Sequence, residues 1–200
     1  NDGLKALASI TGLTTLDLQR CHRVSDDWLW WARSHLTALT DLNLARCKQV
    51  SDHGLRGLAG HTIPTPCHLP PSLTALNLSN CDRVSDAGVL QLGHLTALAR
   101  LNLANSGVSG EGLRALASLA GFTTLSLADC WTVDEDGMRR LAGLTALTSL
   151  NLRDCCQVSD DGLRAPAGLT GLTTLDLFGC ENVSNDGLQD SHLGCRIHTW

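Results

Sequence analysis

The chain has 200 residues, 43% of them hydrophobic, and a formal net charge of −5. This length suits one domain with a sizeable core. No run of 18 apolar residues and no N-terminal leader occurs, so we expect no membrane partner and an intracellular location in the cytoplasm or nucleus. The mild charge has no block of like sign, which argues against nucleic acid as a partner, because such proteins need a clustered basic face.

Seven copies of one unit follow each other along the chain. The steps between their first strand leucines are 26, 34, 25, 24, 25 and 25 residues. A period of this length predicts a solenoid. The copies are LTTLDLQRCHRVSDDWL (13–29), LTDLNLARCKQVSDHGL (39–55), LTALNLSNCDRVSDAGV (73–89), LARLNLANSGVSGEGL (98–113), FTTLSLADCWTVDEDGM (122–138), LTSLNLRDCCQVSDDGL (147–163) and LTTLDLFGCENVSNDGL (172–188).

Each unit predicts a strand, a turn and a short helix. The L-x-L pair alternates with period two, so Leu150 and Leu152 point inward while Ser149 and Asn151 point outward. The Ser-Asp pair before Gly-Leu-x-x-Leu supplies side-chain oxygens for the first N–H groups of a helix. Packed helices need about 8–10 Å between axes, whereas paired strands lie about 4.8 Å apart. We therefore expect a bent stack with parallel strands on the concave side and helices on the convex side.

Cysteine recurs at one phase of the unit, immediately after the strand. We expect a structural ladder of reduced thiols there, because a small side chain with a weak donor suits a turn that exposes carbonyl groups to the interior. Neighbouring thiols would lie about one strand spacing apart, so distance alone leaves bridging open, although disulfides belong mainly to secreted chains. The ladder positions are Cys21, Cys47, Cys81, Ser106, Cys130, Cys155 and Cys180.

The repeated unit resembles the cysteine-containing class of leucine-rich repeat. The resemblance rests on stretches such as CKQVSDHGLRGLA (47–59) and CQVSDDGLRA (156–165) and covers about residues 1–190. It implies an α/β fold, a right-handed horseshoe, and a scaffold for protein–protein interaction. In F-box/leucine-rich-repeat proteins of this class the solenoid is the substrate receptor of a ubiquitin ligase. No F-box-like segment precedes the repeats here, so a ligase role is only an implication of the resemblance.

The expected organisation is a single domain over residues 1–190, with an N-terminal half repeat followed by seven strand-bearing repeats. The beginning, Asn1 to Leu4, matches Asn185 to Leu188, so we expect a fragment of a longer protein. A proline-rich insertion occupies 60–72, and 191–200 is expected to be an irregular C-terminal tail. His61, Cys67 and His68 lie in the insertion without the paired spacing of a zinc site, so no metal is predicted.

The concave strand face is the expected binding surface for a protein or peptide. Side chains just before the cysteine phase change from basic to neutral to acidic along the solenoid, which would orient a partner. The alternative is that these charges follow this order by chance on a solvated surface. The expected partner-binding residues are Arg20, Arg46, Arg100, Asp129, Trp131, Arg153, Asp154 and Phe178.

Trp28 and Trp30 suggest a possible second surface on the convex side. Both fall outside the leucine phase of the first complete repeat, and exposed tryptophans are frequent interface anchors. The alternative is that the proline-rich insertion folds over them.

An enzyme is not expected. Catalysis requires a convergent set of groups with tuned acidity, and the recurring serines and aspartates are explained by helix capping. We therefore predict no catalytic residue and no cofactor. Alternatives to a binding scaffold are a structural segment of a larger intracellular assembly and a fragment without independent function, and the oligomeric state is open.

Overall fold

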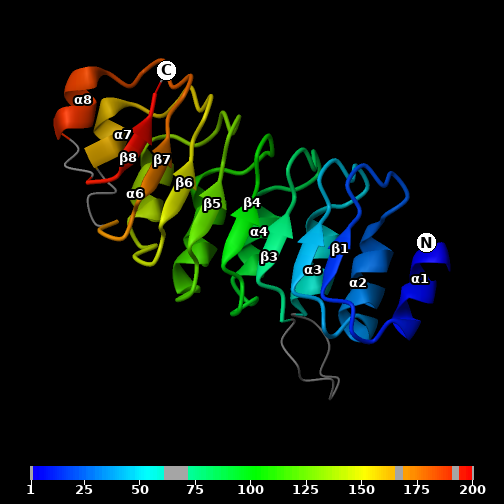
Figure 1. The fold of residues 1–200 in the computed structure, drawn as a ribbon. Helices are drawn as coiled ribbons and strands as arrows, with labels where there is room; N and C mark the ends of the chain where they lie inside the picture. The colour runs from blue at the N-terminus through cyan, green and yellow to red at the C-terminus, as the bar shows by residue number, and fades with distance from the viewer. Residues whose placement is uncertain (1, 61–71, 165–168, 191–193, 200) are drawn as a thin grey trace.

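The computed structural model describes residues 2–60, 72–164, 169–190 and 194–199. Its centre is one parallel sheet whose eight strands follow chain order, with the helices lying behind the strands (Figure 1). This arrangement confirms the predicted α/β solenoid. The strands are β1 (Thr15–Asp17), β2 (Asp41–Asn43), β3 (Ala75–Asn77), β4 (Arg100–Asn102), β5 (Thr124–Ser126), β6 (Ser149–Asn151), β7 (Thr174–Asp176) and β8 (Arg196–His198).

The helices are short, as expected for elements that return the chain within one repeat. None of the described helices has the length and apolar content needed to cross a bilayer. They are α1 (Asp2–Lys5), η1 (Ala6–Ser9), α2 (Asp26–His35), α3 (Asp52–Ala59), α4 (Asp86–Leu92), α5 (Gly110–Leu113), η2 (Arg114–Ser118), α6 (Glu135–Leu141), α7 (Asp160–Arg164) and α8 (Asn185–Asp190).

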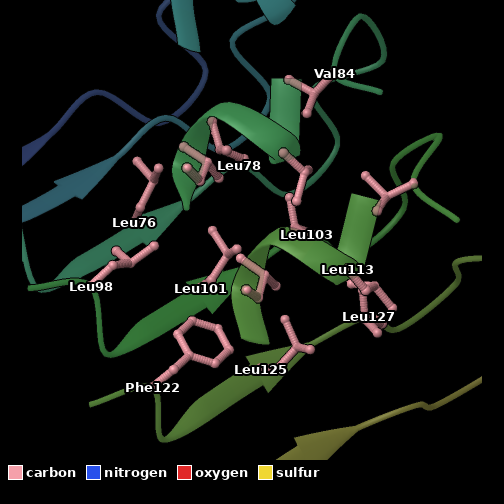
Figure 2. Packing of buried hydrophobic residues seen from close by; sticks show 14 of the residues in the cluster. Leu76, Leu78, Val84, Leu98, Leu101, Leu103, Leu113, Phe122, Leu125 and Leu127 are labelled. Atoms are coloured by element: carbon pink, nitrogen blue, oxygen red, sulfur yellow. The ribbon is translucent and has the colours of Figure 1, made fainter. Parts of the chain in front are cut away.

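The register of the sheet keeps equivalent leucines level. Leu42 pairs with Leu16 on one side and with Leu76 on the other, and the same register continues to β7. These leucines join the helix leucines in one core that runs the length of the solenoid, part of which Figure 2 shows around Leu101. Burying each leucine side chain contributes roughly 1.5–3 kcal/mol, so the leucine period is the main source of the fold.

Aspartate and serine at the helix starts link successive repeats. The Asp26 carboxylate accepts hydrogen bonds from the backbone N–H and the hydroxyl of Ser51 in the next repeat, at 2.8 and 2.6 Å. A Cβ at Gly54 would lie 2.3 Å from Asp26 Oδ1, so the repeated glycine leaves room for this carboxylate. The aspartate therefore joins repeats in addition to favouring the helix start. The other pairs are Asp52–Ser85, Asp86–Ser109 and Asp160–Ser184.

The C-terminal region contains a strand where we expected an irregular tail. β8 pairs in parallel with β7, and Ile197 stands level with Leu175. Arg196 and His198 flank Ile197 with the alternation of the other strands. The step from Leu175 to Ile197 is shorter than the other steps, and isoleucine replaces leucine, which hid this strand in the repeat pattern. Of the proline-rich insertion, 61–71 lie outside the described residues.

Candidate functional site

The strand face of the solenoid is hollowed over β1 to β5. The hollow has a volume of about 380 Å³, and side chains from all five strands line it. Because side chains alternate along a strand, every second residue faces this hollow. The outward-facing lining residues are Thr15, Asp17, Asp41, Asn43, Ala75, Asn77, Arg100, Asn102, Thr124 and Ser126.

One column of this face consists mostly of asparagine and aspartate. The side-chain oxygen of Asn77 accepts a hydrogen bond from the backbone N–H of Ser79 at 3.0 Å. The side-chain oxygens of Asn43 and Asn102 likewise accept from the backbone N–H two residues further along the chain. Since the carbonyl of each amide is used, the NH₂ group is the part left for a partner. This column was not among the binding residues predicted from the sequence, although the residue between the two strand leucines is Asn or Asp in all repeats but the fifth.

Arg100 forms part of an ion pair on the strand face. Its guanidinium donates to Asp41 Oδ1 at 2.7 Å, reaching across β3, where the intervening residue is the small Ala75. Lys48 similarly pairs with Asp82. Arg100 and Lys48 are therefore both locally neutralised, and exposed pairs of this kind contribute at most about 1 kcal/mol each to stability.

The position just before the cysteine phase has a left-handed backbone in every repeat. Arg20 and Arg46 adopt φ values of 62° and 61°. Asparagine, aspartate and glycine tolerate this conformation, and these types occupy the other five repeats. Part of the predicted charge order therefore reflects what the backbone allows. Equivalent values occur at Asn80 (57°), Asn105 (51°), Asp129 (58°), Asp154 (56°) and Gly179 (73°).

Three of the predicted partner-binding residues, Arg153, Asp154 and Phe178, form one cluster. The Arg153 guanidinium lies 4.1 Å from the ring centre of Phe178 and 3.1 Å from the Asp154 carboxylate. Phe178 is 40% exposed and Trp131 is 67% exposed. Arg20 and Arg46 form no ion pair among the described residues and belong to the opposite end of the sheet. The predicted residues thus divide into a basic group and an aromatic, acidic group.

Five of the six ladder cysteines are buried, and their thiols bind the preceding repeat. The Sγ of Cys47 donates to the carbonyl of Leu18, and Cys155 donates to that of Leu127, both at 3.1 Å. Burial raises the pKa of the Cys47 thiol to about 11 and also raises that of Cys155. The eight cysteines that the structure describes are free, with Cys21 exposed at the first ladder position. The remaining donors of this kind are Cys81, Cys130 and Cys180.

Ser106 departs from the thiol ladder. Its hydroxyl donates to the Leu103 carbonyl of its own repeat at 2.6 Å. The fourth repeat has one residue fewer than the others between the ladder position and the following valine, and the serine does not follow the cysteine geometry.

The prediction that Trp28 belongs to a second surface is wrong, because its side chain is fully buried. The equivalent residue in the other repeats is a buried glycine, so this helix phase faces inward whatever the side chain. Trp30 is half-buried against α3, where a Cβ at Gly57 would lie 2.4 Å from its Nε1. The sequence pattern could not show this, because the space that Gly57 leaves for an indole is visible only in three dimensions.

The described residues contain no group of three His, Cys, Asp or Glu side chains arranged to hold a metal ion. His61, Cys67 and His68, which we considered as ligands, lie outside this part of the chain. The shifts resolved for thiols all raise the pKa, whereas an activated nucleophile needs a lowered one.

Five segments match the family model described as leucine-rich repeat: 35–59, 70–93, 94–117, 143–165 and 169–190. Together they cover more than half of the chain. The protein belongs to the leucine-rich repeat family. No match was found among curated proteins for this leucine-rich repeat chain.

Solved structures show the same fold at low sequence identity. Internalin C2 from Listeria monocytogenes is 20% identical with a TM-score of 0.65, and the match covers 98% of this leucine-rich repeat chain and 84% of internalin C2. TLR13 in complex with ssRNA13 is 20% identical with a TM-score of 0.62, over 88% of this chain and 24% of that chain. A chain of the yeast Rad7–Elc1 complex is 18% identical with a TM-score of 0.63, over 96% and 56%.

Proposed function

We propose that the protein is a scaffold for protein–protein interaction whose partner binds in the hollow of the strand face. The hollow over β1 to β5 is the main support for this proposal, because its outward side chains, apart from Ala75, are polar and are held in place by the sheet. The column of asparagine NH₂ groups offers regularly spaced donors, which suits the carbonyl-rich surface of a protein or peptide. The role is binding and not catalysis.

A protein fits the charge of this face better than a nucleic acid does. Asp17 and Asp41 line the hollow. Among the described residues that line it, Arg100 is the only basic one, and it is paired with Asp41. A phosphate backbone requires unpaired Lys and Arg residues. TLR13 is a leucine-rich-repeat neighbour solved with RNA, so the distinction rests on these side chains and not on the fold.

We further propose that the protein belongs to the cysteine-containing class of leucine-rich repeat and is intracellular. In this proposal it recognises a substrate as F-box/leucine-rich-repeat proteins do. The buried thiols that donate to the preceding repeat support the class, because cysteine has a specific structural use here. Free thiols support a reducing compartment. The fold similarity to a chain of the Rad7–Elc1 complex is consistent with assembly into a larger complex.

Affinity capture with matched variants tests the binding face. Asn77→Arg combined with Asn102→Arg places two long side chains in the middle of the hollow. Ala87→Arg combined with Ala117→Arg adds the same charge at exposed positions of α4 and η2. We expect proteins captured by the unmodified chain from a cell extract to be lost with the first variant and kept with the second. Equal retention by both folded variants would contradict the proposal.

A further inference from the structure

A second hollow lies beside the turn that follows β4. It has a volume of about 290 Å³ and is here called the fourth-repeat hollow. Only Gly107 separates Ser106 from Val108, where the other repeats have two residues at this point. The missing residue leaves space between the third and fifth repeats. The lining residues are Asp82, Asn105, Ser106, Gly107, Asp129, Trp131 and Thr132.

Trp131 forms an aromatic wall of this hollow. Its side chain is 67% exposed, the highest value among the large hydrophobic residues that the structure describes as exposed. The equivalent positions of the third and sixth repeats carry the polar Asp82 and the small Cys156. An exposed indole beside a cavity offers a flat face to a cation or a planar group.

The hydroxyl groups of the hollow have already used their protons within the chain. Thr132 Oγ1 donates to the Val108 carbonyl at 2.6 Å, and Ser106 Oγ donates to the Leu103 carbonyl at 2.6 Å. Asn105 donates one amide proton to Asn80 Oδ1 at 3.0 Å, which leaves its own Oδ1 as an acceptor. The side-chain oxygens of the hollow are therefore acceptors, and a complementary ligand has to be rich in donors.

The hollow carries negative charge, which agrees with the hydrogen-bond acceptors that line it. Asp129 is exposed and forms no ion pair among the described residues. Asp82 lies on the other side and is paired with Lys48. The described residues that line the hollow include no basic side chain. One carboxylate is thus available for a cationic ligand.

We propose that the fourth-repeat hollow binds an arginine side chain of a protein partner. A guanidinium carries five N–H donors in a plane, so it stacks on the Trp131 indole and donates to Asp129 and Asn105 together. An ammonium group has fewer donors and no planar face. This inference deepens the proposed function, on which it rests, by naming one side chain that the partner presents.

Titration with short peptides tests this site directly. The probes are acetyl-Gly-Gly-Xaa-Gly-Gly-amide with arginine, its uncharged isostere citrulline, or lysine at Xaa. The readout is the indole N–H signal of Trp131 in a ¹⁵N-correlated spectrum, assigned with Trp131→Phe. We expect a saturable shift with the arginine peptide. We expect at least about fivefold weaker binding of the citrulline peptide, which has no charge to place over the ring, and of the lysine peptide, whose ammonium lacks the planar face and the five donors of a guanidinium.

Asp129→Asn is the matched test of the carboxylate, and Glu181→Gln is its control. Glu181 is an exposed acid two repeats away with no ion pair in the described structure. We expect Asp129→Asn to weaken arginine-peptide binding about fivefold, and Glu181→Gln to change it by less than about twofold, because distant exposed charges are screened. Equal effects of the two variants, or equal binding of arginine and citrulline or lysine peptides, would overturn the site. Loss of partner capture with Asn77→Arg and Asn102→Arg would still stand in that case, so the two proposals fail separately.

Discussion

Cys47 donates its thiol proton to the carbonyl oxygen of Leu18 in the preceding repeat, across an Sγ–O distance of 3.1 Å. The same carbonyl accepts the backbone N–H of Cys21 at 3.0 Å. Each thiol thus gives a buried carbonyl a second hydrogen bond, and such a bond contributes about 0.5–1.5 kcal/mol. Cysteine is retained at this phase because it fits a small buried site and carries a donor.

Removing one ladder thiol should therefore destabilise the protein. We expect Cys155→Ala to lower the free energy of unfolding by about 1–2 kcal/mol, because it removes a buried sulfur and the hydrogen bond to Leu127. Cys156→Ala is the control, since Cys156 is exposed and off the ladder. Urea unfolding measures both. A Cys156 variant as unstable as the Cys155 variant would disprove the ladder role.

Alkaline pH should weaken the fold through the same thiols. Burial raises the pKa of Cys47, Cys81 and Cys180 from 9.0 to about 11. Between these values the unfolded chain loses protons that the native state keeps. The free energy of unfolding is thus highest below pH 9 and falls towards pH 11. Each thiol lowers it by at most about 1.4 kcal/mol per pH unit.

Urea unfolding at pH 8 and at pH 10.5 checks this slope. The chain has no tyrosine, and its only lysines are Lys5 and Lys48, so few other groups titrate in this range. The free energy of unfolding should fall less between these pH values in Cys47→Ala than in the unmodified chain. In Cys156→Ala it should fall by the full amount. Identical pH profiles for the two variants would refute the assignment.

The glycine of the Ser-Asp-x-Gly turn should be intolerant of a methyl group. A Cβ at Gly54 would lie 2.3 Å from Asp26 Oδ1 and 2.7 Å from Leu29 Cδ1. We expect Gly54→Ala to destabilise the protein by about 1–3 kcal/mol through overpacking. Gly121→Ala should have little effect, because no atom lies within 4 Å of the added Cβ. Thermal unfolding compares the two, and similar melting temperatures would argue against the inter-repeat contact.

Relief of backbone strain should stabilise the basic end. Arg46 has φ 61°. This conformation is unfavourable for most L-residues by about 1–2 kcal/mol, and asparagine tolerates it better. We expect Arg46→Asn to raise the free energy of unfolding by about 1 kcal/mol, or somewhat less. Arg83→Asn should not, because Arg83 is an exposed residue in an isolated β-bridge with Ser51 and has no positive φ. If Arg46→Asn also weakens partner capture, the arginine is kept for binding at the expense of stability.

The repeat pattern predicted most of the fold, because the leucine period determines both the strand register and the core. It also located the five buried cysteines of the ladder, since one side-chain type recurs at one phase, but it did not predict that Ser106 departs from it. It failed for Trp28, where a single inward-facing position carries tryptophan in place of glycine. It failed for β8 as well, where Ile197 follows a shortened step.

The candidate site was predictable only in part. The left-handed backbone at Arg20 and Arg46 and the ion pair between Arg100 and Asp41 depend on three-dimensional geometry that spacing does not encode. The fourth-repeat hollow arises from one missing residue, whose consequence is visible only when neighbouring repeats are stacked.

Carboxylate footprinting of the chain with and without a captured partner tests the binding face most directly. Carbodiimide labelling read by mass spectrometry compares Asp17, which lines the strand-face hollow, with Asp161 and Asp186, which are exposed on α7 and α8. The proposed scaffold predicts that the partner suppresses labelling of Asp17 and leaves the two helix residues unchanged. Protection of Asp161 and Asp186 with Asp17 still fully labelled would contradict it.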